Sequence, residues 1–323
     1  MLDFLLSQLY KVIKCFKPNP AYYQCPDDIS QRPIGVQRPY AGAYFLISGI
    51  ILILIYLVCF IAILKSEHRR TPSHRIMVIL AIFDILSLFV NAVITGIYGI
   101  YGVSYCDRPL EIYIFGSIGF GSWMGCCISS ICLGVCRCAD LSSNFGLKFL
   151  FESWKLYIIL LSLICYGLLG ALMGKPIIFT SEYMSWFFDP RIGKDPTHYF
   201  NYIHTANNLG VTISIIILYV YLCYLINKEW SMTTFSRTQI RIILQSVIIC
   251  GFHGLSALSY VYMQFVDASE SLVLFAEVIW EFNDGSVAIV YLILNKNIRR
   301  SVIDMICPKM LKPNNAIYND SGI

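Results

Sequence analysis

Seven long apolar stretches, separated by shorter polar segments, run along the 323-residue chain. They cover residues 41–64, 74–101, 110–138, 154–174, 202–226, 239–265 and 272–294. A helix needs about 20 apolar residues, at a rise of about 1.5 Å each, to cross a lipid bilayer. The pattern therefore predicts an all-α membrane protein built as a bundle of seven transmembrane helices. We expect three regions: an N-terminal tail (1–40), the bundle (41–294) and a C-terminal tail (295–323).

The distribution of lysine and arginine predicts which way the bundle faces. Fifteen of the 24 basic residues follow the odd-numbered spans, and cytoplasmic loops carry such an excess. We therefore expect an extracellular N-terminus and a cytoplasmic C-terminal tail, although five of the other basic residues lie in the N-terminal tail. The segment NIRRSVIDMIC after the seventh span predicts a short amphipathic helix on the inner membrane surface. Its last residue, Cys307, is either a palmitoylation site or an unmodified thiol.

Composition agrees with a membrane protein and excludes two other classes. The chain is 57% hydrophobic and 14% charged, which is more apolar side chain than a soluble domain buries. The net charge of +4 is small and no basic run is long enough to follow a phosphate backbone, so no nucleic-acid partner is expected. The hydrolase motifs GxSxG and HExxH do not occur, and we expect no catalysis.

The third span contains five cysteines in the segment CCISSICLGVCRC, residues 126–138. A metal centre needs ligands that converge on one point, whereas a helix turns about 100° per residue and spreads these sulfur atoms over several faces. The alternative is that cysteine acts as a small apolar residue beside the glycines and serines of this span. A helix that is small on every face predicts a central position in the bundle. On the extracellular side, Cys25 and Cys106 either pair, tying the tail to the loop before span three, or remain free thiols.

Five acidic residues lie inside the predicted spans, where an ionisable group must face protein or water. One of them, Glu111, begins span three and is expected at the membrane interface, and the other four lie deeper. Asp84 is in span two, and Glu277, Glu281 and Asp284 share one face of span seven at spacings of four and three residues. Asp84 and Asp284 lie at similar depths. If their helices are neighbours, either a cation lies between the two carboxylates or one of them is protonated.

Further side chains extend these two groups. Ser87 and Asn283 could add oxygen atoms around Asp84 and Asp284, although the aspartates could equally make only hydrogen bonds between helices. Glu277 and Glu281 lie nearer the outside, where they line either a ligand site or a solvated vestibule. His204 and Trp123 are candidates for the wall and floor of a pocket, or for ordinary packing.

Several sequence segments together resemble one family of receptors. They are WFFDP (186–190), YFNYIHTANN (199–208), SRTQIRIILQSVIIC (236–250), YVYMQF (260–265) and YLILNKNIR (291–299). With seven spans and an arginine at the inner end of span three, the chain resembles the G-protein-coupled receptors. Within them it resembles the nematode chemoreceptors of serpentine receptor class T, over nearly its whole length.

The resemblance implies roles for three groups of residues. Arg137 takes the place of the arginine that forms the switch and contacts the G protein, with Tyr291 and Asn295 beside it. Asp84 matches the span-two aspartate that holds a sodium ion in many such receptors, and Asn283 and Asp284 fall where its partners would be. Ser87 is a further candidate at this polar site, and no other cofactor is expected. The implied ligand pocket comprises Tyr113, Trp123, His204, Asn207, Asn208, Glu277 and Glu281.

The chain departs from the receptor pattern at several points. Cys136 stands where the family usually has asparagine, and no acidic residue precedes Arg137. Spans six and seven lack the usual prolines. The loop after span four has no cysteine for the usual receptor disulfide, which makes the Cys25–Cys106 pair the alternative.

The resemblance implies a function and a location. We expect a multi-pass receptor in the plasma membrane of nematode sensory neurons. The cilia of these neurons are one candidate location. It would bind an unknown small molecule, contact membrane lipids and signal through a heterotrimeric G protein. The alternative is a secondary transporter, or a proton- or cation-coupled channel, that uses the four buried carboxylates as a relay.

Overall fold

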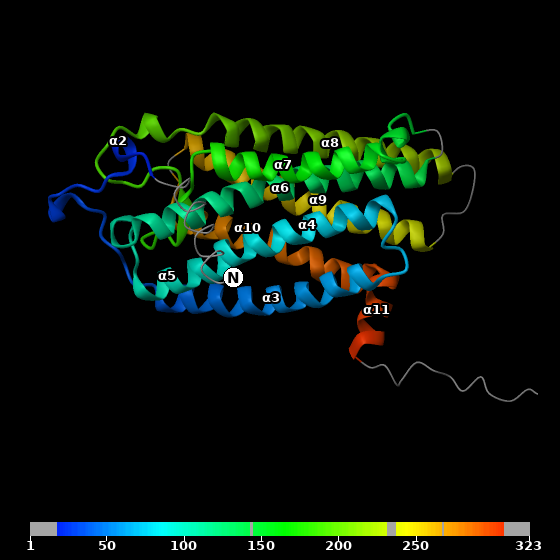
Figure 1. Cartoon of the computed structure of the whole chain (residues 1–323), viewed down its shortest axis with the longest axis horizontal. Coiled ribbons are helices and arrows are strands. Elements are labelled where there is room, and N and C mark those ends of the chain that lie inside the picture. Colours follow the sequence, from blue (N-terminus) through cyan, green and yellow to red (C-terminus); the bar gives the residue numbers. More distant parts are fainter. Residues whose placement is uncertain (1–17, 143–144, 231–236, 267, 307–323) are drawn as a thin grey trace, which may run out of the picture.

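The computed structural model describes residues 18–142, 145–230, 237–266 and 268–306, and Figure 1 shows them as an elongated helix bundle. The first two spans are α3 (Pro39–Lys65) and a continuous rod made of α4 (Pro72–Leu88), the π-helical segment η2 (Phe89–Ile94) and α5 (Thr95–Tyr101). The other five are α6 (Pro109–Leu141), α7 (Lys155–Met173), α8 (Tyr202–Trp230), α9 (Arg237–Phe265) and α10 (Glu270–Leu294). The predicted seven-helix bundle is confirmed.

Local sequence explains where several of these helices begin and end. α3, α4 and α6 each start at a proline, whose missing N–H costs nothing in the first turn. The Ser269 hydroxyl accepts from the backbone N–H of Leu272 and caps α10. α5 ends at Gly102, which has a φ of 68°, a conformation that glycine adopts without strain.

The seventh span, α10, differs from the other six in composition. Among the described residues, the other six spans are apolar enough to cross a membrane by hydropathy alone. α10 carries Glu277, Glu281 and Asp284, which are all fully buried. Its exposed side chains include Phe275 and Phe282, so the helix presents apolar residues outward and acids to its neighbours.

α6 lies at the centre of the bundle, as the small residues of span three predicted. It packs against α4, α7, α8 and α9 and against the extracellular hairpin described below. Gly121 on α6 meets Gly167 of α7 so closely that a Cβ atom would lie 2.7 Å from the Gly167 carbonyl oxygen. The α6 cysteines are free, and among the described residues only Cys126 joins a group that could hold a metal ion.

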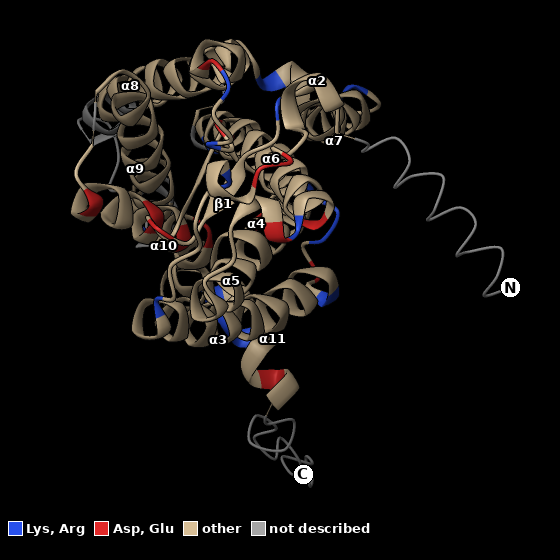
Figure 2. Cartoon of the chain, turned by 90° about the vertical axis from the view of Figure 1, so that its left-hand side faces the viewer, with Lys and Arg blue, Asp and Glu red and all other residues tan. Residues whose placement is uncertain are grey.

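A two-stranded antiparallel hairpin is the departure from the predicted all-α fold. Strand β1 (Ile178–Thr180) pairs with β2 (Ser185–Phe187), and Phe179 lies opposite Trp186. Both of these rings are buried. Seen end-on, β1 lies inside the ring of helices (Figure 2). The loop between α7 and α8 therefore fills the extracellular end of the bundle.

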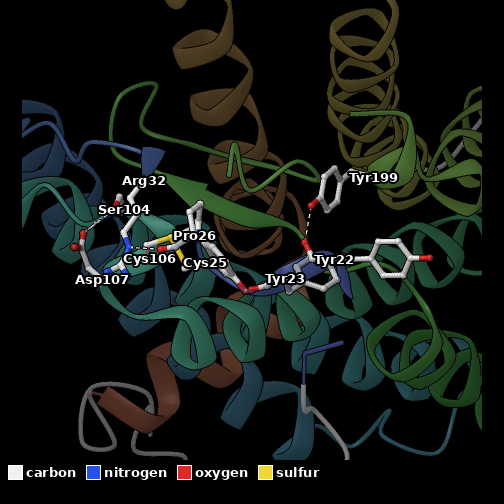
Figure 3. Close-up of a disulfide and its surroundings, with 10 residues drawn as sticks. Tyr22, Tyr23, Cys25, Pro26, Arg32, Ser104, Cys106, Asp107 and Tyr199 are labelled. Carbon is white, nitrogen blue, oxygen red and sulfur yellow. Dashed lines mark hydrogen bonds between the residues drawn. A yellow bond between two sulfur atoms is a disulfide. The ribbon is translucent and has the colours of Figure 1, made fainter. Parts of the chain in front are cut away.

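The N-terminal segment is fixed on top of this hairpin. Cys25, just after the short helix α2 (Pro20–Tyr23), is joined by a disulfide to Cys106 of η3 (Tyr105–Asp107). The hydroxyl of Tyr199, at the end of η5 (Pro196–Tyr199), donates to the backbone carbonyl of Tyr22 at 2.6 Å. Figure 3 shows both this bond and the disulfide. The described part of the N-terminal region therefore covers the extracellular end of the bundle and is attached to it.

The chain ends its described part with the amphipathic helix α11 (Lys296–Ile306), which follows α10 directly. Ile298 and Val302 are buried on the face that packs against α3. This is the short helix that the sequence predicted after the seventh span. Cys307, the palmitoylation candidate, lies outside the described residues.

Candidate functional site

A cavity beneath the hairpin is the first part of the candidate site, and we name it the aromatic pocket. It has a cavity volume of about 30 Å³ and is lined by Phe120, Trp123, Ile177, Trp186, Phe188, His204, Tyr260 and Trp280. An outer chamber of about 200 Å³ shares Trp186, Phe188, His204 and Tyr260 with it. The two spaces together have room for a small organic molecule, and their lining is mostly apolar, as is usual for ligand pockets.

The three indole rings of the aromatic pocket are held in place by hydrogen bonds. Each indole N–H donates to a side-chain oxygen: Trp123 to Asn208 at 2.9 Å, Trp186 to Thr95 at 2.8 Å and Trp280 to Ser87 at 3.1 Å. These partners lie on α8, α5 and α4. A buried indole whose N–H is satisfied has one preferred orientation, so the pocket walls are largely preformed.

Sequence reasoning placed seven residues in the ligand pocket, and two of them, Trp123 and His204, line it. Asn207 and Asn208 form a layer behind these two. The Asn207 amide donates to Asn208 Oδ1 at 3.1 Å, and its own Oδ1 accepts from the Tyr166 hydroxyl at 3.0 Å. The asparagines therefore position the wall and do not form it.

The other three predicted pocket residues line neither the aromatic pocket nor the outer chamber. Glu277 is fully buried behind Tyr260, accepting from its hydroxyl at 2.8 Å and from Ser185 Oγ at 2.7 Å. Glu281 is also fully buried and faces α3, and Tyr113 packs edge-on against Tyr23. Neither glutamate is part of a solvated vestibule, because the hairpin covers the space that the sequence left open.

Sequence reasoning did not predict four residues that line the pocket: Trp186 of the hairpin, Phe188 just after it, Tyr260 and Trp280. WFFDP and YVYMQF were noticed only as family signatures. Trp280 lies between Glu277 and Glu281 in sequence, and the prediction for this helix rested on the spacing of its acids alone. A pattern of aromatic residues on α9, α10 and the loop before α8 is the signal that could have found them.

Deeper in the bundle, the buried carboxylates of Asp84 and Asp284 approach each other, as their depths suggested. One oxygen of each lies with Cys126 Sγ in a group whose members are all within 4.8 Å of one another. Asp284 accepts from Asn91 Nδ2 at 3.0 Å and from Asn283 Nδ2 at 2.8 Å. We name Asp84, Ser87, Asn91, Asn283 and Asp284 the polar cluster.

The polar cluster has oxygen atoms that could hold a cation. Asp84 Oδ2 accepts from the Tyr56 hydroxyl, whereas Asp84 Oδ1, Asn91 Oδ1 and Asn283 Oδ1 are buried and have no hydrogen-bond partner among the described residues. Hard cations prefer carboxylate and amide oxygens, so this donor set fits a sodium ion. Asn91, Tyr56 and Cys126 were not anticipated, because nothing in their local sequence marks them as partners of Asp84.

At the opposite end of α6, Arg137 is almost fully buried, with 7% of its surface exposed. Its guanidinium lies 3.8 Å from Asp140 Oδ2 and donates to Met77 Sδ at 3.5 Å. Asp140 also accepts from Ser73 Oγ at 2.8 Å, and Ser73 Oγ lies 3.3 Å from Cys136 Sγ. The acidic partner absent before Arg137 is thus supplied three residues after it, and Cys136 contacts α4 through Ser73.

Arg137 lines a cavity that opens at the cytoplasmic end. Its other walls are His74, Arg241, Gln245 and residues 294–297, and its volume is about 90 Å³. Asn295 is in this wall, and its Oδ1 accepts from the backbone N–H groups of Asn297 and Ile298, at 3.2 Å each, at the start of α11. Tyr291 is fully buried, and its hydroxyl has no partner among the described residues.

Comparison with known proteins agrees with this arrangement. The family model described as serpentine type 7TM GPCR chemoreceptor Srt matches residues 6–315. Serpentine receptor class T-55 of Caenorhabditis elegans is 27% identical over 309 residues, which are 93% of this chain and 85% of that protein. The crystal structure of squid rhodopsin has the same fold, with a TM-score of 0.66 and 15% identity over 91% of this chain and 92% of that one.

The family match over residues 6–315 covers all of the described helices and strands, and therefore both ends of the bundle. A chain of this kind is a multi-pass membrane receptor and not an enzyme. The chain belongs to the Srt family of serpentine seven-transmembrane G-protein-coupled chemoreceptors.

Proposed function

We propose that this receptor binds a small molecule in the aromatic pocket and passes the signal to a heterotrimeric G protein at the Arg137 cavity. One observation carries the proposal: both sites are built on the same central helix, with Trp123 in the pocket and Arg137 in the cavity. They are 14 positions apart in the sequence, or roughly 21 Å along α6 at the α-helical rise. A rigid, central α6 could transmit a shift between the two.

The polar cluster lies on a second connection between the ends. Trp280 lines the aromatic pocket and donates to Ser87, one turn of α4 after Asp84. Asp284 follows Trp280 by one turn on α10 and lies beside Asp84. A ligand that moves Trp280 therefore changes how α10 packs on α4. Only a ligand with different affinities for the two packings can shift their populations.

We also propose that the polar cluster binds a sodium ion. Asp84 and Asp284 would neutralise the ion, with Asn91 and Asn283 as further oxygen ligands. When bound, the ion supplies positive charge between two buried carboxylates, which cannot both remain ionised at close range without it. It would hold α4 against α10 and stabilise one packing of the bundle.

The proposed location is the plasma membrane of a sensory cell, with the cilium as its candidate site, because a receptor for external chemicals must expose its pocket end to the outside. The Arg137 cavity then faces the cytoplasm, where the G protein is. Palmitoylation of Cys307 would add a second lipid contact beside α11.

The proposed function is tested by nucleotide exchange on a G protein. Receptor in lipid nanodiscs is mixed with a promiscuous G protein and a panel of small molecules, and GTP-analogue uptake is measured. We expect at least one compound to accelerate exchange with the wild type and not with Arg137→Ala. An ion flux that Asp84→Asn abolishes, together with exchange that Arg137→Ala leaves intact, would contradict the receptor proposal and favour the transporter alternative.

A further inference from the structure

The outer chamber combines aromatic walls with a single acid. Six of its eleven lining residues are tryptophan, phenylalanine or tyrosine. Its described lining contains one acid, Asp189, and no lysine or arginine. A positively charged group in such a space is attracted both by the carboxylate and by the faces of the aromatic rings.

Asp189 has one carboxylate oxygen that is available to a ligand. Its Oδ1 accepts from the backbone N–H of Arg191 at 2.8 Å, whereas its Oδ2 has no partner among the described residues. The side chain is only partly buried and lines the chamber, so a molecule there can reach Oδ2. Burial, followed by the charge of Asp189, raises the pKa of Tyr199 to about 12, so the carboxylate also acts on a second wall of the chamber.

The basic side chains around the chamber leave the charge of Asp189 uncompensated. The guanidinium of Arg191 forms an ion pair with Glu182 at 3.1 Å. The ammonium groups of Lys175 and Lys194 donate to backbone carbonyls. None of these three cations lines the chamber.

His204, which also lines the chamber, adds no positive charge. Its Nε2 lies 3.1 Å from Asn208 Nδ2, and Asn208 Oδ1 accepts from the indole N–H of Trp123. Asn208 therefore points its amide donor at the imidazole, Nε2 must accept, and the ring is neutral. The potential inside the chamber is set by Asp189 and favours a cation.

The position of Asp189 gives such a ligand a direction. Asp189 borders the outer chamber alone, whereas Trp186, Phe188 and Tyr260 border both the chamber and the aromatic pocket. A charged group beside the partly exposed carboxylate keeps part of its hydration. An apolar chain attached to it can extend inward between the shared rings.

The size of the two spaces limits the ligand. The outer chamber holds about 200 Å³ and the aromatic pocket about 30 Å³, which is less than the roughly 300–1,000 Å³ of sites for drug-sized molecules. A small molecule buries little apolar area, so a charge-assisted hydrogen bond accounts for a large share of its affinity.

We propose that the ligand is a small protonated amine, with its ammonium group donating to Asp189 Oδ2 and its apolar chain lying between the rings shared with the aromatic pocket. Because Oδ2 is a hydrogen-bond acceptor, an ammonium that carries N–H groups is favoured over a quaternary one. This inference rests on the proposed function, since it takes the two spaces as the ligand site. It adds the chemical class of the ligand and the residue that selects its charge.

The ligand class is tested with primary alkylamines from propylamine to hexylamine, which are protonated at neutral pH. Each amine is compared with the alcohol, the trimethylammonium derivative and the carboxylate of the same chain length. Binding is measured by the thermal stability of the nanodisc receptor, with no G protein present. We expect the best amine to bind about tenfold more tightly than its alcohol. The trimethylammonium derivative should bind more weakly than the amine, and the carboxylate should bind weakest because Asp189 repels it.

Asp189→Asn removes the charge but keeps the Oδ1 atom that accepts from the Arg191 backbone, so the loop retains its local structure. This variant should bind amines about tenfold more weakly and alcohols as before. Asp195→Asn is the matched control. Asp195 Oδ1 accepts from the Thr197 backbone N–H at 2.9 Å in the same loop, and Asp195 does not line the chamber. Its variant should bind amines as the wild type does.

Phe188→Leu tests the direction of the ligand. It removes a ring that borders both spaces, so it should weaken amine and alcohol equally. A loss of amine binding alone would place the ammonium group at Phe188 and overturn the proposed arrangement. Equal binding of amine and alcohol to the wild type, amine binding that Asp189→Asn leaves unchanged, or no amine binding up to the solubility limit would overturn the inference.

Failure here is distinguishable from failure of the proposed function. A receptor that stimulates the G protein only with uncharged or acidic compounds contradicts the ligand class and leaves the function intact. A receptor that binds amines through Asp189 without stimulating any G protein has the opposite result.

Discussion

The extracellular end of the bundle is closed by long-range attachments, whereas Arg137 at the cytoplasmic end is held by few contacts. Outside, a disulfide joins Cys25 to Cys106, and a hairpin fills the space between the helices. Inside, the contacts of Arg137 are a 3.8 Å ion pair with Asp140 and a 3.5 Å contact with Met77. The first arrangement preforms a pocket, and the second leaves a surface that can rearrange at small cost.

The largest expected effect comes from opening the extracellular cover. The Cys25–Cys106 bond closes a loop with a sequence separation of 81, so removing it enlarges the conformational freedom of the unfolded chain. We expect the double variant Cys25→Ser, Cys106→Ser to lose about 2–5 kcal/mol of stability, measured as a lower melting temperature in nanodiscs. Replacing the exposed Cys165 by serine is the control, and equal melting of both variants would contradict the difference between the ends.

A somewhat smaller effect is expected from displacing the hairpin alone. A Cβ atom on Gly116 would lie 1.6 Å from the Ile177 carbonyl oxygen, so Gly116→Ala must push the loop away from α6. We expect a loss of about 3 kcal/mol, together with weaker binding in the aromatic pocket. Gly210→Ala is the matched control on α8, where a Cβ atom meets nothing within 4 Å, and it should stabilise the helix slightly. Similar melting of the two variants would disprove tight packing of the hairpin.

The polar cluster lies between the two ends, and its expected contribution depends on the ion. Wild-type receptor should melt at a higher temperature in sodium chloride than in choline chloride of equal ionic strength. The corresponding gain in the free energy of unfolding is about 1–3 kcal/mol. Asp84→Asn and Asp284→Asn should abolish this difference. Glu281→Gln, which removes a buried acid that faces α3, should keep it. A sodium effect that survives both aspartate substitutions would place the ion elsewhere.

The smallest effect is expected at the cytoplasmic end. Asp140 is half exposed, and such ion pairs contribute at most about 1 kcal/mol. Asp140→Ala should therefore raise basal nucleotide exchange by a factor of about two to five while leaving the melting temperature nearly unchanged. The control is Glu152→Ala, which removes an exposed acid from the connection between α6 and α7 and should have no effect. A large loss of stability in Asp140→Ala would show that this end is as rigid as the other.

The pattern of long apolar stretches was sufficient to predict the seven-helix bundle, because each span must satisfy its backbone internally and bury polar groups away from lipid. The depth and spacing of the acids in spans two and seven also brought Asp84 and Asp284 together correctly. The hairpin was missed because its strands, IFT and SWF, have three residues each and are stabilised by the surrounding helices rather than by their own sequence.

The same limit applies to the candidate site. Asn91 lies on the π-helical segment and donates to Asp284, 193 positions away in the sequence, and nothing in FVNAVI marks it as a partner. Glu277 was placed in a pocket because its position in span seven is near the outside. The structure instead buries it against Ser185, on a strand that the sequence did not predict. Contacts between residues far apart in sequence therefore decided which candidates line the pocket.

The central claim is that the aromatic pocket and the Arg137 cavity are coupled, and coupling between two binding sites is reciprocal. The most direct measurement is the affinity of a pocket ligand for nanodisc receptor, with and without nucleotide-free G protein, in the wild type and in Arg137→Ala. We predict that the G protein raises the affinity about tenfold in the wild type and leaves it unchanged in Arg137→Ala. An affinity that is the same with and without G protein in the wild type would contradict the account.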